Sequence, residues 1–159
     1  MTVYFYDNST DALINTDTGV ASGTSASVSW NGRTRGNTYE FYTKSNDGED
    51  DSSNSAVASF TVNALPTATS IETGNATNPL RTIDFSPYFD WTYADGDTDT
   101  QTNYQIQVGT TENSSDLWDS GSVSSSDNFV IYGGTALSRG VRYYVRVRVH
   151  DGYEWSIWQ

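Results

Sequence analysis

The chain has 159 residues, and its 20 acidic side chains outnumber its 8 basic ones, which gives a formal charge of −12. This balance excludes nucleic acid and anionic membrane surfaces as partners, because both are bound through basic patches. No apolar run approaches the roughly 20 residues that a membrane-spanning helix needs, so we expect no direct insertion into a membrane.

The composition favours strands. Only 35% of the residues are hydrophobic, yet aromatic residues reach 14%. Disordered chains are also poor in hydrophobic residues, but they are poor in aromatic residues as well. Tyr, Trp, Val and Thr pack well on a pleated surface. We therefore predict an all-β protein.

Short runs of alternating apolar and polar residues predict the strands. In chain order, the runs cover residues 3–6, 26–30, 39–43, 58–62, 88–93, 104–108, 129–132 and 143–149. Turn-forming pairs such as Asn31-Gly32 follow several of them. In the last run, odd positions face one side of the strand, whereas Arg146 and Arg148 face the other.

One pattern occurs twice. A Gly-x-x-Tyr motif is followed, eight residues after the Tyr, by Asp-Gly, and the second copy lies 104 residues after the first. The tyrosines of the two copies are Tyr39 and Tyr143. A pattern repeated at one offset indicates two modules of one kind. We place them at residues 1–64 and 65–159, with residues 63–67, which include Pro66, as the linker.

The second module carries the cues of a known family. Leu137, Gly140 and Tyr143 follow one another at three-residue spacing, and Trp91 lies in an earlier strand. These residues resemble fibronectin type III-like modules of archaeal and bacterial cell-surface proteins, in which such a Leu and Tyr form a tyrosine corner. The resemblance implies two immunoglobulin-like, fibronectin type III-like β-sandwich modules in tandem.

Aligned with that family, both modules are incomplete. The first lacks its first strands, and the second lacks its last strand. Two interpretations stay open. The chain is a fragment of a longer array, or a neighbouring domain or molecule supplies strands at open sheet edges, so that the chain self-associates by strand exchange.

Two tryptophans follow the strand that carries the arginines. Trp155 and Trp158 stand in a Trp-Ser-x-Trp stretch. In fibronectin type III modules of cytokine receptors, a similar stretch stacks on arginines. The resemblance implies a structural ladder of Arg146, Arg148, Trp155 and Trp158, with each exposed cation–π contact contributing about 0.5–1 kcal/mol. The alternative is an aromatic platform for sugar rings.

One loop has the carboxylate spacing of a calcium loop. Asp95, Asp97 and Asp99 occupy alternate positions, and Ca²⁺ prefers such oxygen ligands. The loop is no EF-hand, because Thr100 and Ile106 stand where that motif needs Gly and Glu. A Ca²⁺ site and a solvated acidic turn are the two interpretations. We expect no other cofactor.

Catalysis finds little support. His150 is the one histidine, there is no cysteine, and no glycine-rich phosphate loop precedes the one lysine. Asn8, Asn75 and Asn113 fit the N-glycosylation pattern, which is typical of surface loops in exported proteins.

The resemblance implies a function without catalysis. We expect a structural or adhesive module of an exported cell-surface protein, which acts as a spacer, display or surface-layer unit. Its partners would be neighbouring domains of a longer parent chain. One alternative is an accessory carbohydrate-binding module of a glycoside hydrolase, with surface glycans as partners. Another is a self-assembling, strand-exchanged filament subunit.

Overall fold

The computed structural model describes residues 1–74 and 85–159, and the chain divides into two compact units. Unit 1 is Met1–Asn63 and unit 2 is Ala64–Gln159. Every regular element in the described residues is a β-strand, which confirms the all-β prediction. Within this part of the chain, no helix is long and apolar enough to cross a membrane.

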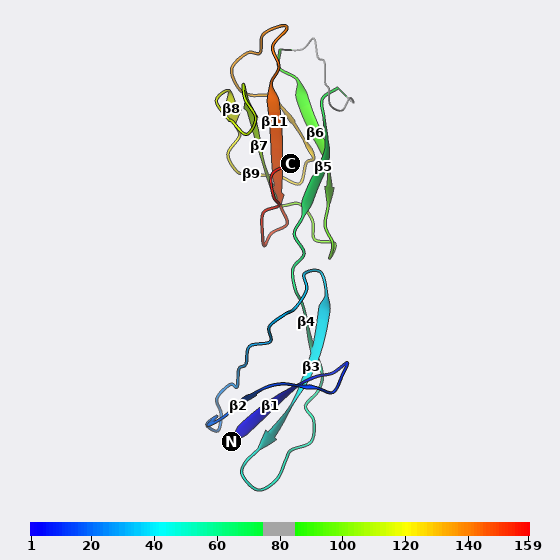
Figure 1. Cartoon of the computed structure of the whole chain (residues 1–159), viewed down its shortest axis with the longest axis vertical. Helices are drawn as coiled ribbons and strands as arrows, with labels where there is room; N and C mark the ends of the chain where they lie inside the picture. Colours follow the sequence, from blue (N-terminus) through cyan, green and yellow to red (C-terminus); the bar gives the residue numbers. More distant parts are fainter. Residues whose placement is uncertain (75–84) are drawn as a thin grey trace. The chain divides into compact units, whose positions relative to one another are not determined.

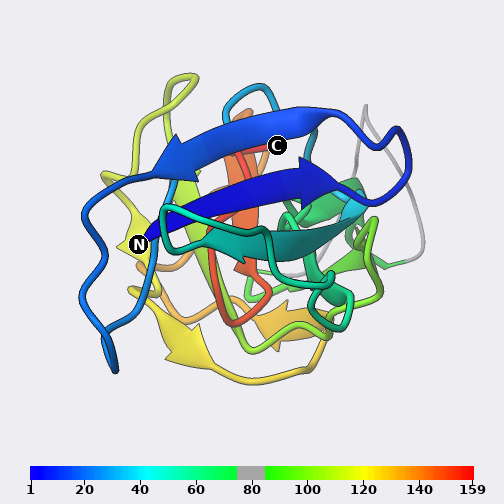
Figure 2. The same cartoon turned by 90° about the horizontal axis from the view of Figure 1, so that it is seen from below.

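Unit 1 holds one antiparallel sheet. Its strands are β1 (Thr2–Asp7), β2 (Leu13–Asp17), β3 (Thr38–Asn46) and β4 (Ala58–Thr61). They are arranged in the order β2-β1-β3-β4, and Figure 2 shows β1 between β2 and β3. In the described part of this unit, the sheet is a single layer.

Unit 2 holds two sheets. One consists of β5 (Thr67–Glu72), β6 (Tyr88–Ala94) and β10 (Phe129–Ile131), in the order β10-β6-β5. The other consists of β7 (Asn103–Gly109), β8 (Trp118–Asp119), β9 (Val123–Ser124) and β11 (Tyr144–His150). There β7 pairs with β11 on one side and with β8 and β9 on the other (Figure 1).

The two sheets of unit 2 share one hydrophobic core. Its buried residues are Ala68, Phe89, Trp91, Tyr104, Ile106, Val108, Tyr132, Val147 and Val149. The indole of Trp91 donates a hydrogen bond of 3.1 Å to Gln101, so its polar atom is satisfied inside the core. Two sheets packed over a common core make a β-sandwich, as the immunoglobulin-like fold class predicts.

Both units contain a tyrosine that closes a local turn. The Ser138 amide donates to the Tyr143 hydroxyl at 2.8 Å, and Leu137 packs against the core. In unit 1, the Thr34 amide donates to Tyr39 at 2.9 Å. The repeated motif therefore adopts the same local conformation in both units.

The two Asp-Gly pairs also form equivalent turns. A carboxylate oxygen of Asp47 accepts the amides of the residues two and three positions later, at 3.1 and 3.3 Å. Asp151 does the same at 2.6 and 2.7 Å. The following glycines, Gly48 and Gly152, have φ of 114° and 108°, a region that favours glycine.

The structure has no strand at residues 26–30, so that prediction is wrong. Val28 and Trp30 are half-buried and the serines between the apolar residues are exposed, so the alternation is real. However, the Ser27 amide binds the side chain of Asp17 instead of a neighbouring strand. Alternation decides which way side chains point, but a strand also needs a backbone partner.

Residues 155–159 lie along β11. The Ser156 amide donates to the Val149 carbonyl at 2.8 Å, while Val147 and Gln159 exchange two bonds of 3.0 and 3.1 Å. No strand is assigned after β11 in the described residues. These bonds nevertheless satisfy backbone groups on the side of β11 that faces away from β7.

Candidate functional site

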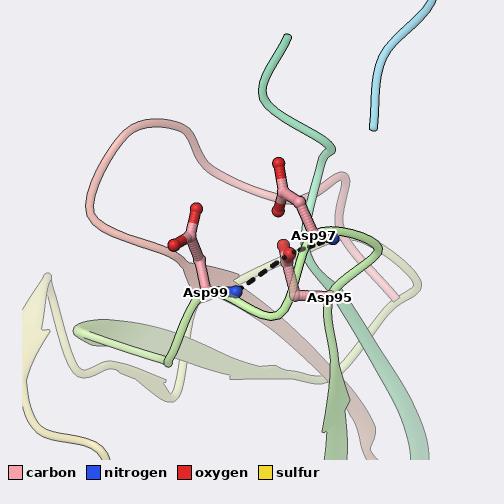
Figure 3. Close-up of side chains that lie close together, drawn as sticks. All are labelled: Asp95, Asp97 and Asp99. Atoms are coloured by element: carbon pink, nitrogen blue, oxygen red, sulfur yellow. Dashed lines mark hydrogen bonds between the residues drawn. The ribbon is translucent and has the colours of Figure 1, made fainter. Parts of the chain in front are cut away.

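The predicted calcium loop places its three carboxylates together. The acidic loop, residues 95–99, follows β6 directly, and Figure 3 shows Asp95, Asp97 and Asp99 on it. One side-chain oxygen from each lies within 4.8 Å of the others. Asp95 shapes the loop by accepting the amides of Asp97 and Asp99 at 3.0 and 3.3 Å. Thr98 has a φ of 72°, which completes the tight turn.

A second contact anchors the loop inside unit 2. The Ala64 amide donates to a carboxylate oxygen of Asp97 at 2.8 Å. A Cβ atom at Gly96 would lie 3.1 Å from the Cβ of Ala64, so this position leaves little room for a side chain. The loop is therefore held closely against the residue that precedes β5.

Two carboxylate oxygens of this loop have no donor. With both side chains ionised, Oδ2 of Asp95 and Oδ1 of Asp97 are buried and receive no hydrogen bond from any described residue. Burial raises the pKa of Asp95, and a side-chain hydrogen bond with Asp97 raises it further while it lowers the pKa of Asp97. Buried acceptors without a donor are costly, and a hard cation would satisfy both oxygens at once.

The carboxylates of the acidic loop also raise the pKa of Tyr93. Its hydroxyl donates to the backbone oxygen of Asp99 at 2.9 Å. Burial, followed by the carboxylates of Asp95, Asp151, Asp99 and Asp97, raises the pKa of Tyr93 to about 12. The acidic loop is thus a region of negative potential with a fourth carboxylate nearby, which suits a cation.

The arginines and tryptophans predicted to form a ladder lie together on the outer face of β11. The Arg146 guanidinium lies 4.6 Å from the ring centre of Trp158. The Arg148 guanidinium lies 4.6 Å from Trp155 and 4.8 Å from Trp158. We call these four residues the Trp–Arg ladder. Guanidinium groups lie over both indoles, on ring surface that a sugar would need.

Two glutamines and an aspartate support the ladder from the neighbouring strands. Arg146 donates to Gln107 at 2.8 Å, and Arg148 donates to Gln105 at 2.7 and 3.0 Å. Both glutamines in turn donate to Asp119, at 2.7 and 2.6 Å. The polar atoms of the outer face therefore form a connected row across β11, β7 and β8.

The hydrogen bonds of this row lower the pKa of Asp119. Burial acts to raise its pKa, but hydrogen bonds from Gln105, the Gly121 amide and Gln107, together with the Arg148 charge, outweigh burial and lower the pKa. Sequence reasoning missed these partners. The signal was present, because Gln105 and Gln107 alternate with core residues and therefore face outward.

Residues 68–159 match the model of a protein family described as Rha78A-like, N-terminal immunoglobulin domain. The chain belongs to this family. The matched residues contain nearly all of unit 2, including the acidic loop and the Trp–Arg ladder. The immunoglobulin-like part of the predicted fold is thereby confirmed.

The chain is also similar to parts of two solved structures. An alpha-L-rhamnosidase from Dictyoglumus thermophilum is 28% identical with a TM-score of 0.52, and the match covers 57% of this chain and 11% of that chain. The chain thus spans about a tenth of the length of that enzyme. A two-domain fibronectin type III segment of chicken tenascin is 14% identical with a TM-score of 0.46, covering 99% of this chain and 79% of that chain. No curated protein matches.

In this Rha78A-like immunoglobulin domain, the one histidine is engaged in local contacts. Nδ1 of His150 accepts the Gly152 amide at 2.9 Å, and its ring lies 5.0 Å from that of Trp155, edge to face. The Nδ1 lone pair is therefore occupied by a backbone amide.

The glycosylation candidates lie in exposed loops where the structure describes them. Asn8 is exposed and donates to Glu40 at 2.8 Å. Asn113 is exposed, and its side-chain oxygen accepts from Arg146 at 3.3 Å. Asn75 lies outside the described residues.

Replacing Arg148 by Lys tests the ladder. Lysine keeps the charge but loses the planar group that covers two indoles and binds Gln105. We expect the free energy of unfolding to fall by about 1 kcal/mol in denaturant titrations. The matched control is Arg142→Lys at an exposed position, which should change it by less than about 0.5 kcal/mol. Equal effects of the two substitutions would contradict a stabilising ladder.

Proposed function

We propose that the chain is a non-catalytic accessory module of a longer, exported glycoside hydrolase or a related multidomain protein. The observation that carries this proposal is the match of residues 68–159 to an N-terminal immunoglobulin domain family. The similarity to 11% of an alpha-L-rhamnosidase supports it, because the resemblance lies in a small part of a large enzyme. Neighbouring domains of the parent chain would be its first partners.

A cell-surface role is the second candidate. The candidate glycosylation sites at Asn8 and Asn113 support export, and the lack of cysteine is compatible with a prokaryotic surface protein. There the module would space or display other domains. Fold alone does not decide between this role and an enzyme accessory.

Calcium binding by the acidic loop belongs to the same proposal. The two buried oxygens without a donor, on Asp95 and Asp97, favour a cation over a solvated turn. Ca²⁺ would be held by Asp95, Asp97 and Asp99, whose oxygens lie within 4.8 Å of one another. Its role would be to stabilise the loop against Ala64, with no part in catalysis.

Two assays test the function. One measures glycoside hydrolysis by the purified chain, and the other measures antibody labelling of cells of the source organism. We expect no nitrophenol release from nitrophenyl α-L-rhamnoside or other nitrophenyl glycosides above the protein-free baseline. Antibodies against the chain should label intact cells or detect the parent protein in the medium. Hydrolysis that scales with chain concentration would contradict an accessory role. Labelling that requires cell lysis would contradict export.

Thermal melting with and without millimolar Ca²⁺ tests the metal site. Ligand at 100 times its Kd stabilises a protein by about 2.7 kcal/mol, so the melting temperature of the chain should rise. In Asp95→Asn, the loop can keep its turn, because asparagine also accepts backbone amides, but the Ca²⁺ effect should shrink. Asp50→Asn, in the exposed acidic turn of unit 1, is the matched control. An unchanged melting temperature in millimolar Ca²⁺ would rule out the site.

A further inference from the structure

Unit 1 repeats the hydrogen bonds of one sheet of unit 2. The Ser45 amide donates to the Ser52 hydroxyl at 3.0 Å, and the Ser52 amide donates to the Ser45 carbonyl at 2.8 Å. At the offset of 104 residues, Val149 and Ser156 form the same two bonds at the same lengths. In its backbone contacts, β3 is therefore the equivalent of β11.

The strand register extends this equivalence to β1 and β7. The residue that lies opposite Ser45 is Val3. The counterpart of Ser45 in β11, Val149, lies opposite Tyr104 of β7. In unit 2, the layer of β7 and β11 is covered by the layer of β5, β6 and β10. In unit 1, all of whose residues the structure describes, β1 and β3 have no such second layer.

Residues 26–30 occupy the place of β10 along the chain. The segment follows β2 and precedes β3, just as β10 follows β8 and β9 and precedes β11. It runs as a coil (Figure 1), yet Ala26, Val28 and Trp30 are half-buried and the serines between them are exposed. In β10, Val130 likewise packs on the core between two exposed residues. Residues 26–30 thus have the side-chain pattern of a strand in a second layer.

This segment and the sheet line an apolar cavity of about 230 Å³. Its lining residues are Phe5, Ile14, Val28, Trp30, Phe41 and Phe60. Trp30 packs against the rings of Tyr39 and Phe60, with ring centres 5.6 and 5.9 Å apart, but Phe60 stays 39% exposed. The layer that residues 26–30 begin is therefore incomplete, and a further strand in it would remove more apolar surface from water.

The backbone of residues 26–30 has one open edge. Within the described residues, the Ser27 amide, which donates to Asp17, is the one backbone group of this segment that has a hydrogen-bond partner. Successive backbone groups of an extended segment point to opposite edges, so those of Val28 and Trp30 point away from Asp17. In unit 2, β10 uses its corresponding edge to pair with β6. The open edge of residues 26–30 is therefore the place where a strand equivalent to β6 would pair.

We propose that unit 1 receives this missing strand from the parent polypeptide that leads into β1. The strand pairs antiparallel with residues 26–30, as β6 pairs with β10, and its alternate apolar side chains fill the apolar cavity. The source is the same polypeptide, because in unit 2 the short loop of residues 95–102 joins β6 directly to β7.

Two further arguments favour this source over a second copy of the chain. A strand of the same polypeptide loses no translational freedom when it pairs. The formal charge of −12 also opposes association between copies. The inference requires a parent chain that continues ahead of unit 1, but it does not require the accessory role. Unit 1 also lies outside the residues that match the family, 68–159.

Hydrogen exchange of an extended chain tests the proposal. A copy of residues 87–101 is added directly before Met1, so that the copied β6 stands as far ahead of β1 as β6 stands ahead of β7. We expect the amides of Val28 and Trp30 to exchange at least about tenfold more slowly than in the unextended chain, because they gain partners. Unchanged exchange of both amides would overturn the proposal.

A matched extension separates strand pairing from the effect of added length. It carries Phe89→Ser and Trp91→Ser in the copied segment, which remove the two side chains that face the core in β6. This control should slow the exchange of Val28 and Trp30 much less, and the Val130 amide of unit 2 should exchange as before in both extended chains. Equal slowing by the two extensions would also overturn the proposal.

Sedimentation of the unextended chain tests strand exchange between copies. We expect a monomer at all concentrations, with the amides of Val28 and Trp30 unprotected. A dimer in which these two amides are protected would overturn the proposal in favour of strand exchange with a second copy.

Discussion

A β-sheet with one apolar face needs a second layer, and this constraint governs the rest of the structure. In unit 2, β5, β6 and β10 form a layer that packs through a common core on the layer of β7 and β11. Ile106 and Val147, which face this core, are fully buried. Once the inner faces are closed, the two outer faces are free for other uses. One carries the Trp–Arg ladder, and the other exposes Tyr88, Phe129 and Ile131.

Unit 1 has the local motifs of unit 2 but no second sheet. It has the same tyrosine contact and the same Asp-Gly turn as unit 2. Its buried apolar residues, within the described part, are Val3, Val20 and Tyr42. Aromatic side chains such as Trp30 and Phe60 cover its sheet only in part. Local motifs depend on a few neighbouring residues, whereas stability depends on how much apolar surface is removed from water.

The sequence predicted most long strands, because apolar residues that face a core alternate with polar residues that face solvent. It failed at residues 26–30, where alternation exists but the Ser27 amide binds Asp17. It also missed β2 and β5, whose Thr, Asn and Ser residues obscure the alternation. The strands β8 and β9 were missed as well, because two residues are too few to show a period. The acidic loop could be anticipated from the spacing of its carboxylates, and the Trp–Arg ladder from the resemblance of its Trp-Ser-x-Trp stretch to a known family. The cluster of exposed apolar side chains at Tyr88, Phe129 and Ile131 could not, because it depends on which residue of β10 lies opposite each residue of β6.

Native-state hydrogen exchange of the whole chain tests most directly whether the second layer provides the stability. The account predicts that the amides of β7 and β11 exchange only when unit 2 unfolds globally, which makes them the slowest in the chain. The amides of β1 and β3 should exchange markedly faster, because their sheet is a single layer in the described residues. Equal or greater protection of β1 and β3 would contradict the account.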